Sequence, residues 1–84
     1  MSSLDFVGTH IRILIAELLD LEEPPLASDN MFELGVDSLM LVDLKDRIKS
    51  ELAVDLRFSD FFTYFTIRDL AAAIVLLSPI KGAK

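Results

Sequence analysis

The stretch Glu33-Leu34-Gly35-Val36-Asp37-Ser38-Leu39-Met40 decides how this chain folds. It closes a long irregular segment and opens an amphipathic helix. Asp37 suits the N-cap position, so we expect Ser38 in the first turn, at the positive end of the helix. Free N–H groups make such an end receptive to a phosphate or another anion. Ser38 is therefore the first candidate for a functional side chain.

The helix that follows runs from about Ser38 to Leu52. At 100° per residue one of its faces is apolar and is expected in the core; this face comprises Leu41, Leu44, Ile48 and Leu52. Leu39 and Val42 fall on roughly the opposite face, beside Asp43 and Asp46. An apolar pair rimmed by carboxylates is typical of a protein-docking surface. The alternative is that another element covers Leu39 and Val42.

Upstream, the chain reads as a first helix from about Ser3 to Leu21. Ser2 followed by Asp5 has the spacing of a capping box. Apolar residues recur at three- and four-residue steps and predict one buried stripe; they are Phe6, Ile11, Leu14, Ile15, Leu18 and Leu21.

Between the two helices, residues 22–37 form a long loop. Pro24 and Pro25 stop any helix, and no clear period follows. A connection this long inside a small domain is often functional. Gly35 suits a turn with positive φ, which would aim the residues after it. Four apolar residues are expected to anchor the loop, namely Leu26, Met31, Phe32 and Leu34.

Downstream, residues 53–58 read as an extended connector that buries Val54 or Leu56. Residues 59–64 read as one short helical turn, and three phenylalanines, Phe61, Phe62 and Phe65, accompany it. We expect Leu44 and Phe62 to be core side chains, so that truncation of either to alanine costs about 2–5 kcal/mol.

The last helix is expected over Ile67–Leu77. Thr66 followed by Asp69 is a second capping-box pattern, and the inner face comprises Ile67, Leu70, Ala71, Ile74 and Leu77. Pro79 and Gly82 end the helix, and residues 79–84 are expected to be a mobile tail. The sequence therefore predicts an all-α domain over residues 1–84: a bundle of three main helices plus one short helix, with mostly local contacts.

Composition narrows the function classes. The 84 residues make one small domain with little room for an enclosed catalytic cavity, and a hydrophobic content of 52% predicts a packed core. The absence of cysteine removes disulfides and thiolate chemistry. No signal-peptide pattern is present, and the longest apolar run, Leu70–Leu77, is too short for a membrane span. We therefore expect a cytoplasmic location with no membrane contact.

Charge is unevenly placed along the chain, whose formal net charge is −6. Eight carboxylates and no Lys or Arg lie between Ile13 and Leu44: Glu17, Asp20, Glu22, Glu23, Asp29, Glu33, Asp37 and Asp43. Such a field repels nucleic acid and anionic lipid and attracts basic protein surfaces. The simpler reading is that these carboxylates only keep a small domain in solution.

An autonomous enzyme is disfavoured by the residues that the chain lacks. A serine hydrolase needs a histidine to accept the serine proton, and His10 in the first helix is the only histidine. One histidine without thiolates does not make a common zinc site. Asp29, Asn30, Glu33 and Asp37 do not match the spacing of a calcium loop, so no metal site is predicted. Ser38 is better interpreted as a covalent attachment point than as a nucleophile.

Two stretches resemble a known family. Residues 32–40, with Leu34-Gly35-Val36-Asp37-Ser38-Leu39 at their centre, resemble the attachment motif of acyl carrier proteins, the phosphopantetheine-binding domains. Residues 62–71 are similar to the junction before the last helix in carrier domains of type I polyketide synthases. The order of helix, acidic loop, motif and junction extends the resemblance over nearly the whole chain. One departure is Phe65, where the family usually has proline, so the junction lacks a fixed φ.

The resemblance implies a function and site residues. Ser38 matches the serine that receives 4′-phosphopantetheine, Asp37 matches the acid before it, and Leu39 and Val42 match helix positions used in docking. Peptidyl carriers usually have a histidine or another residue where Asp37 stands, so the acyl type is favoured. The implied role is a monomeric, non-catalytic carrier of polyketide or fatty-acyl thioesters. Its implied partners are a phosphopantetheinyl transferase, a ketosynthase, an acyltransferase and other synthase domains.

Two alternatives stay open at this point. An unmodified helical interaction module would use the acidic face of the second helix, with Asp43 and Asp46, only for binding. A small hydrolase would require His10 to lie beside Ser38.

Overall fold

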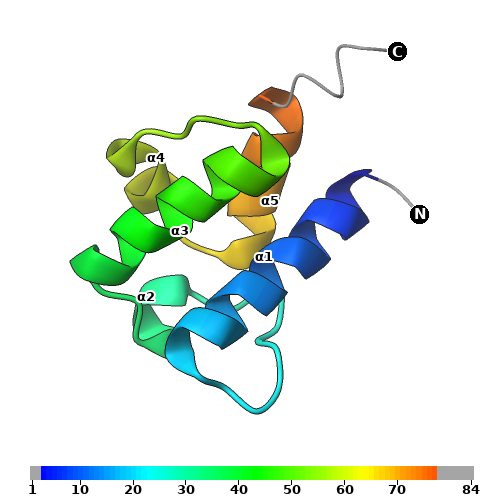
Figure 1. The fold of residues 1–84 in the computed structure, drawn as a ribbon. Helices are drawn as coiled ribbons and strands as arrows, with labels where there is room; N and C mark the ends of the chain where they lie inside the picture. Colours follow the sequence, from blue (N-terminus) through cyan, green and yellow to red (C-terminus); the bar gives the residue numbers. More distant parts are fainter. Residues whose placement is uncertain (1–2, 78–84) are drawn as a thin grey trace.

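The computed structural model describes residues 3–77 of the chain, and all regular elements among them are helices. They are α1 (Ser3–Leu19), α2 (Met31–Leu34), α3 (Ser38–Leu52), α4 (Phe58–Thr63) and α5 (Ile67–Leu77). The all-α prediction is confirmed, and α2 is an additional short helix inside the long loop (Figure 1). Ser2, whose capping role was predicted, and the predicted tail 79–84 lie outside the described residues.

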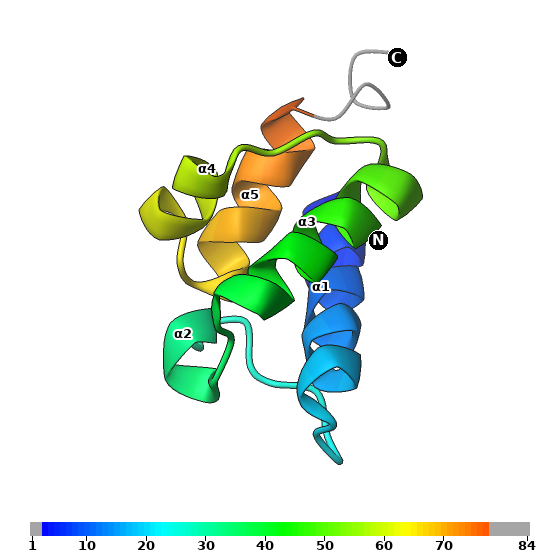
Figure 2. The ribbon, with the colours of Figure 1, turned by 60° about the vertical axis from the view of Figure 1, so that its left-hand side comes forward.

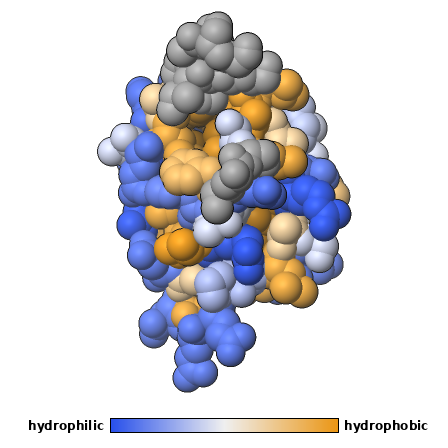
Figure 3. Space-filling view, turned by 90° about the vertical axis from the view of Figure 1, so that its right-hand side faces the viewer, coloured by the Kyte–Doolittle hydropathy of each residue, from blue (hydrophilic) through white to orange (hydrophobic). Residues whose placement is uncertain are grey.

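Three longer helices form the body of the molecule. α1 packs mainly against α5 and also against α3. The short α2 lies next to the start of α3, and α4 lies beside α5; both relationships hold in two views (Figures 1 and 2). The loop after α1 forms the hydrophilic lobe at the bottom of Figure 3. No helix within residues 3–77 is both long enough and apolar enough to cross a membrane.

The core is formed by one face of each long helix. The predicted inner face of α3 is confirmed, because Leu41, Leu44, Ile48 and Leu52 are all buried. Side chains from the other elements close around this face; the fully buried large ones include Ile11, Ile15, Met31, Leu56, Phe61, Ile67, Leu70 and Ile74.

The predicted stripe of α1 is wrong at both ends. Phe6 is 55% exposed, and Val7, one turn before Ile11, is buried in its place. The helix ends at Leu19 because Asp20 adopts a left-handed φ of 57°, while the Leu21 N–H donates back to the Ala16 carbonyl at 2.9 Å. This reversal carries Leu21 out of the helix and leaves it exposed.

The long loop is partly helical because of one side chain. The Asn30 Oδ1 accepts hydrogen bonds from the N–H groups of Phe32, at 2.8 Å, and Glu33, at 3.4 Å, and so caps α2. A four-residue helix is too short to leave a periodic signal in the sequence. Met31 is buried as predicted, whereas the predicted anchor Leu26 is 64% exposed. Phe32 and Leu34 are partly buried against the core.

The second half of the chain follows the prediction with two exceptions. Val54 and Leu56 are both buried, so the connector packs against the core through alternate residues. In α4 only Phe61 is buried; Phe62 is 62% exposed, so the prediction that it is a core side chain is wrong. Leu77 is also exposed, because the last turn of α5 lies at the top edge of the molecule (Figure 1).

Candidate functional site

The backbone just before Ser38 is fixed by two helix ends that lie two residues apart. Gly35 ends α2 with φ 119°, a conformation that only glycine adopts readily. Val36 is buried, and its N–H donates to the Met31 carbonyl at 3.1 Å. Asp37 then begins α3 in an extended conformation. The turn, the buried side chain and the cap together determine where Ser38 lies.

Ser38 is the first residue of α3, and it is exposed. The Asp37 Oδ1 accepts a hydrogen bond from the Met40 N–H at 3.0 Å, and the Asp37 carbonyl accepts one from the Leu41 N–H at 2.9 Å. The predicted N-cap is confirmed. Within residues 3–77 no hydrogen bond engages the Ser38 hydroxyl. An exposed hydroxyl at the anion-receptive end of a 15-residue helix fits a phosphodiester.

The predicted face of α3 is open to solvent. Leu39 is 81% exposed and Val42 is 47% exposed, so the alternative that another element covers them is wrong. Asp43 and Asp46 are exposed as well. At about 100° per residue these four side chains lie within about 100° of arc, next to Ser38. We call Leu39, Val42, Asp43 and Asp46 the α3 face.

Lysines of the same helix do not neutralise the α3 face. The Lys45 Nζ lies 3.2 Å from the Asp55 Oδ1 and 5.5 Å from the centre of the Phe58 ring. Lys49 also approaches Asp55, at 3.8 Å. The hydrogen bond from Lys45, followed by the charges of Lys45 and Lys49, lowers the pKa of the Asp55 carboxyl. No ion pair within the described part of the chain involves Asp43 or Asp46.

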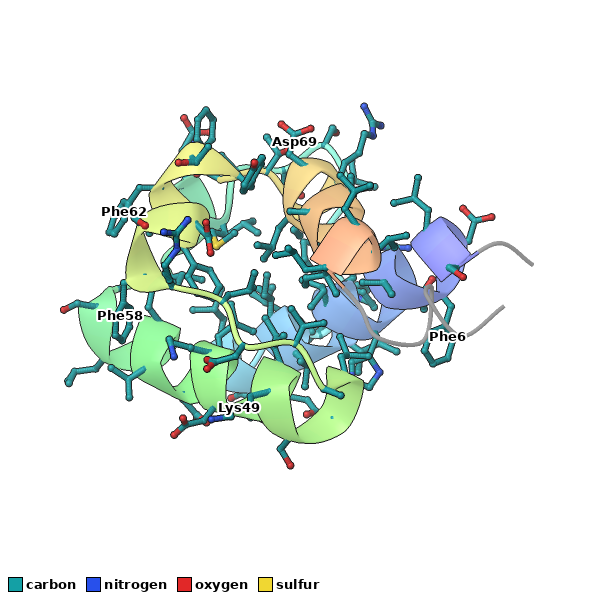
Figure 4. All side chains as sticks on the ribbon, turned by 90° about the horizontal axis from the view of Figure 1, so that it is seen from above. Phe6, Lys49, Phe58, Phe62 and Asp69 are labelled. Carbon is teal, nitrogen blue, oxygen red and sulfur yellow. The ribbon has the colours of Figure 1, made fainter. Side chains whose placement is uncertain are left out.

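Exposed aromatic residues extend the apolar surface beyond α3, which the sequence interpretation missed. Phe58 is 46% exposed, and Phe62 stacks on Phe32 with ring centres 5.2 Å apart and planes 5° apart. In the view from above, Phe58 lies over the first half of α3 (Figure 4). Sequence spacing gave no warning of this, because Phe58, Phe61 and Phe62 stand at i, i+3 and i+4 and so share one face of α4, of which only Phe61 is buried.

His10 is not near Ser38. Its Nε2 lies 2.6 Å from the Glu51 Oε1. Glu51 stands 13 residues after Ser38 in the same helix, which corresponds to about 20 Å along the axis. Arg47 joins the same cluster through Glu51, at 3.6 Å, and also pairs with Glu17 of α1, at 2.9 Å. This histidine belongs to a surface link between α1 and α3, and the hydrolase arrangement is contradicted.

The junction before α5 is held by hydrogen bonds to the long loop. The Phe65 carbonyl accepts from the Met31 N–H at 3.0 Å, and the Ile67 N–H donates to the Asp29 carbonyl at 3.1 Å. The Thr66 Oγ1 accepts from the Asp69 N–H at 3.1 Å, which confirms the predicted cap. The junction therefore does not depend on a proline at position 65, because hydrogen bonds to the long loop hold its backbone in place, and the group of residue 65 that bonds is its carbonyl.

Comparison with known proteins adds to this geometry. The family described as "Phosphopantetheine attachment site" matches residues 9–74. The chain is 34% identical over 72 residues, 86% of its length, to a probable, atypical nonribosomal peptide synthetase, CymA, of Salinispora arenicola. It is 33% identical over 67 residues, 79% of its length, to a non-reducing polyketide synthase of Byssochlamys spectabilis. No solved structure matches the chain.

The chain spans 1% of the length of the first relative and 3% of the second. The family match, in contrast, covers most of this chain and includes α3 with its first residue, Ser38. Members of the family carry covalent 4′-phosphopantetheine and serve synthases as tethers without catalysing a reaction themselves. The chain belongs to this family: it is a non-catalytic phosphopantetheine carrier domain.

Proposed function

We propose that Ser38 carries the 4′-phosphopantetheine arm and that the domain tethers polyketide or fatty-acyl intermediates on it as thioesters. The observation that supports this most directly is the Ser38 hydroxyl, exposed and unengaged at the first residue of α3. A carrier must present its arm outward from a rigid element, because partner enzymes have to reach the cargo. The arm supplies the thiol, and the domain supplies position and recognition.

Attachment requires one external enzyme and coenzyme A. In the proposed step the Ser38 Oγ forms a bond to the pantetheine-bearing phosphorus, the pyrophosphate bond breaks, and 3′,5′-adenosine bisphosphate leaves. The serine proton passes to a base of the phosphopantetheinyl transferase. The product places a phosphodiester at the positive end of α3, where a negative charge gains about 0.3–1 kcal/mol.

Asp37 favours acyl cargo over peptidyl cargo. One relative is named a nonribosomal peptide synthetase and the other a polyketide synthase, so the relatives alone do not decide between peptidyl and acyl cargo. We infer the type of cargo from the residue before the serine. Acyl carriers have an acid at this position, as this chain does with Asp37. The partners that we propose are therefore a ketosynthase, an acyltransferase and further domains of polyketide or fatty-acid-like synthesis.

The α3 face is the proposed docking surface. Leu39 and Val42 supply exposed apolar contact beside the arm, and Asp43 and Asp46 supply charge without intramolecular ion pairs. Acidic charge steers a basic partner surface and raises encounter rates by about 10–10³-fold. Docking of this kind is fast and weak, which suits a carrier that visits several enzymes in turn.

Intact-mass spectrometry tests the attachment site. The wild type, Ser38→Ala and the control Ser50→Ala, another exposed serine of α3, are incubated with coenzyme A and a promiscuous transferase. We expect one added phosphopantetheinyl group on the wild type and on Ser50→Ala, and none on Ser38→Ala. An unmodified wild type with several transferases would instead support an unmodified interaction module.

A further inference from the structure

A second surface feature lies away from the α3 face. A cavity of about 560 Å³ opens between the first half of α1 and the start of α5, next to Ala27 of the long loop. Its described lining includes Leu4, Gly8 and Ala71 and contains no residue of α3. In the view from above, Lys49 of α3 and Asp69, the neighbour of Arg68 in α5, lie on opposite sides of the molecule (Figure 4).

The charge of this cavity is opposite to that of the α3 face. Arg12 and Arg68 line it together with Asp5, so two guanidinium groups face one carboxylate. The Arg12 Nε donates to the Pro25 carbonyl, which holds the side chain in place. Within residues 3–77 no carboxylate pairs with Arg12 or Arg68. On a chain of net charge −6, the cavity is a local basic site.

Two residues of the lining are locally unfavourable choices. Gly8 lies inside α1, where glycine is less stable than alanine. A Cβ at Gly8 would meet only the Ala71 Cβ, at 3.9 Å, so core packing does not demand a glycine there. Arg68 places a cation in the first turn of α5, at the positive end of the helix dipole. Residues such as these, which lower local stability, are expected mainly at functional sites.

We propose that this cavity is a second docking site, which receives a short acidic and apolar peptide segment of a partner protein. A carboxylate of the segment pairs with Arg12 and Arg68, because guanidinium groups bind carboxylates in a fork geometry. An apolar side chain next to it packs against Leu4, Ala27 and Ala71, in the space that Gly8 leaves open. The domain thus has two faces of opposite charge: the α3 face for basic partners and the α1–α5 cavity for an acidic one.

Nuclear magnetic resonance titration of the full chain tests the proposal. The probe is a capped hexapeptide of alternating Glu and Leu, and its controls are the matching Gln and Leu peptide and the fatty acid decanoate. We expect the acidic peptide at millimolar concentration to shift the amide signals of the cavity lining and not those of the α3 face. The Gln and Leu peptide should bind about threefold to fivefold more weakly, within the range of an exposed ion pair.

Three variants test separately whether binding depends on the charge of the cavity and on its open space. Arg68→Gln, at an exposed side chain, should weaken binding of the acidic peptide about threefold or more. Gly8→Leu should block binding by filling the cavity. Arg57→Gln, at an exposed arginine outside the cavity, is the control and should leave binding unchanged.

Four results would overturn the proposal: no shift with the acidic peptide, shifts centred on α3, equal binding of the Gln and Leu peptide, or binding of decanoate alone, which would indicate a small-molecule site. The proposal is independent of the arm on Ser38, because Ser38→Ala should bind the peptide like the wild type.

Discussion

At the scale of single residues, two glycines illustrate opposite uses of a missing side chain. Gly35 has φ 119°, which an L side chain rarely adopts, and the nearest atom to a built Cβ, Leu19 Cδ2, is 3.7 Å away. The requirement for glycine is therefore conformational and not steric. Gly8 has a helical backbone and room for a Cβ. One glycine directs the chain into α3, and the other leaves a space at the surface.

Alanine substitutions at these glycines should change stability in opposite directions. Gly35→Ala should lower the free energy of unfolding by about 1–2 kcal/mol, because alanine disfavours left-handed φ. Gly8→Ala should raise it by about 0.5–1 kcal/mol, because alanine is the better helix former and meets no clash. Urea denaturation of both variants measures the difference. A neutral Gly35→Ala would show that the turn before Ser38 does not require glycine.

At the scale of elements, α4 shows how a short helix divides its side chains. Arg57 begins the helix, and the Asp60 Oδ2 accepts a hydrogen bond from the Arg57 N–H at 2.8 Å. This orientation directs Phe61 into the core at 0% exposure, while Phe58 and Phe62 remain outside. The same helix therefore contributes both to stability and to the apolar surface beside α3.

Adjacent phenylalanines in α4 should respond very differently to truncation. Phe61→Ala should cost about 3–5 kcal/mol, because it empties a buried site. Phe62→Ala should cost about 1 kcal/mol, chiefly through loss of its stacking on Phe32. Denaturant titration at one temperature compares the two with Leu44→Ala, a second core truncation, expected at about 2–5 kcal/mol. Equal losses for Phe61→Ala and Phe62→Ala would contradict the orientation of α4.

At the scale of the whole molecule, charge is divided between surfaces. The radius of gyration of 11.8 Å matches the value of about 12 Å expected for a chain of this length. The molecule measures 36 × 25 × 20 Å, whereas the Debye length at physiological salt is about 8 Å, so exposed charges on opposite faces are largely screened from each other. The net charge of −6 therefore acts at a distance mainly at low salt, and at physiological salt the attraction of a partner depends on which face it approaches.

A charge reversal on the α3 face should affect encounter and not folding. Asp43→Lys should leave the free energy of unfolding nearly unchanged, because Asp43 is exposed and pairs with no described residue. It should slow modification by the transferase several-fold. Glu22→Lys, with the same charge change in the loop after α1, is the control and should slow it less.

Initial rates at low and high salt measure this effect, since salt screens steering and should bring the Asp43→Lys, Glu22→Lys and wild-type rates closer together. A large loss of stability in Asp43→Lys would show that the assignment of the α3 face is wrong.

The sequence alone determined α3, its core face and its cap at Asp37, because these features depend on local periodicity and capping chemistry, whereas the exposure of Leu39 and Val42 was decided by the structure. It also singled out Ser38 and the need for positive φ at Gly35. Tertiary structure decided what local pattern cannot encode: that Phe6, Leu26 and Phe62 are exposed, that Asn30 starts a helix inside the loop, and that Arg12 and Arg68 share one cavity. The physical reason is that burial and proximity depend on which element packs opposite, and residues far apart in the chain meet only once the helices have docked.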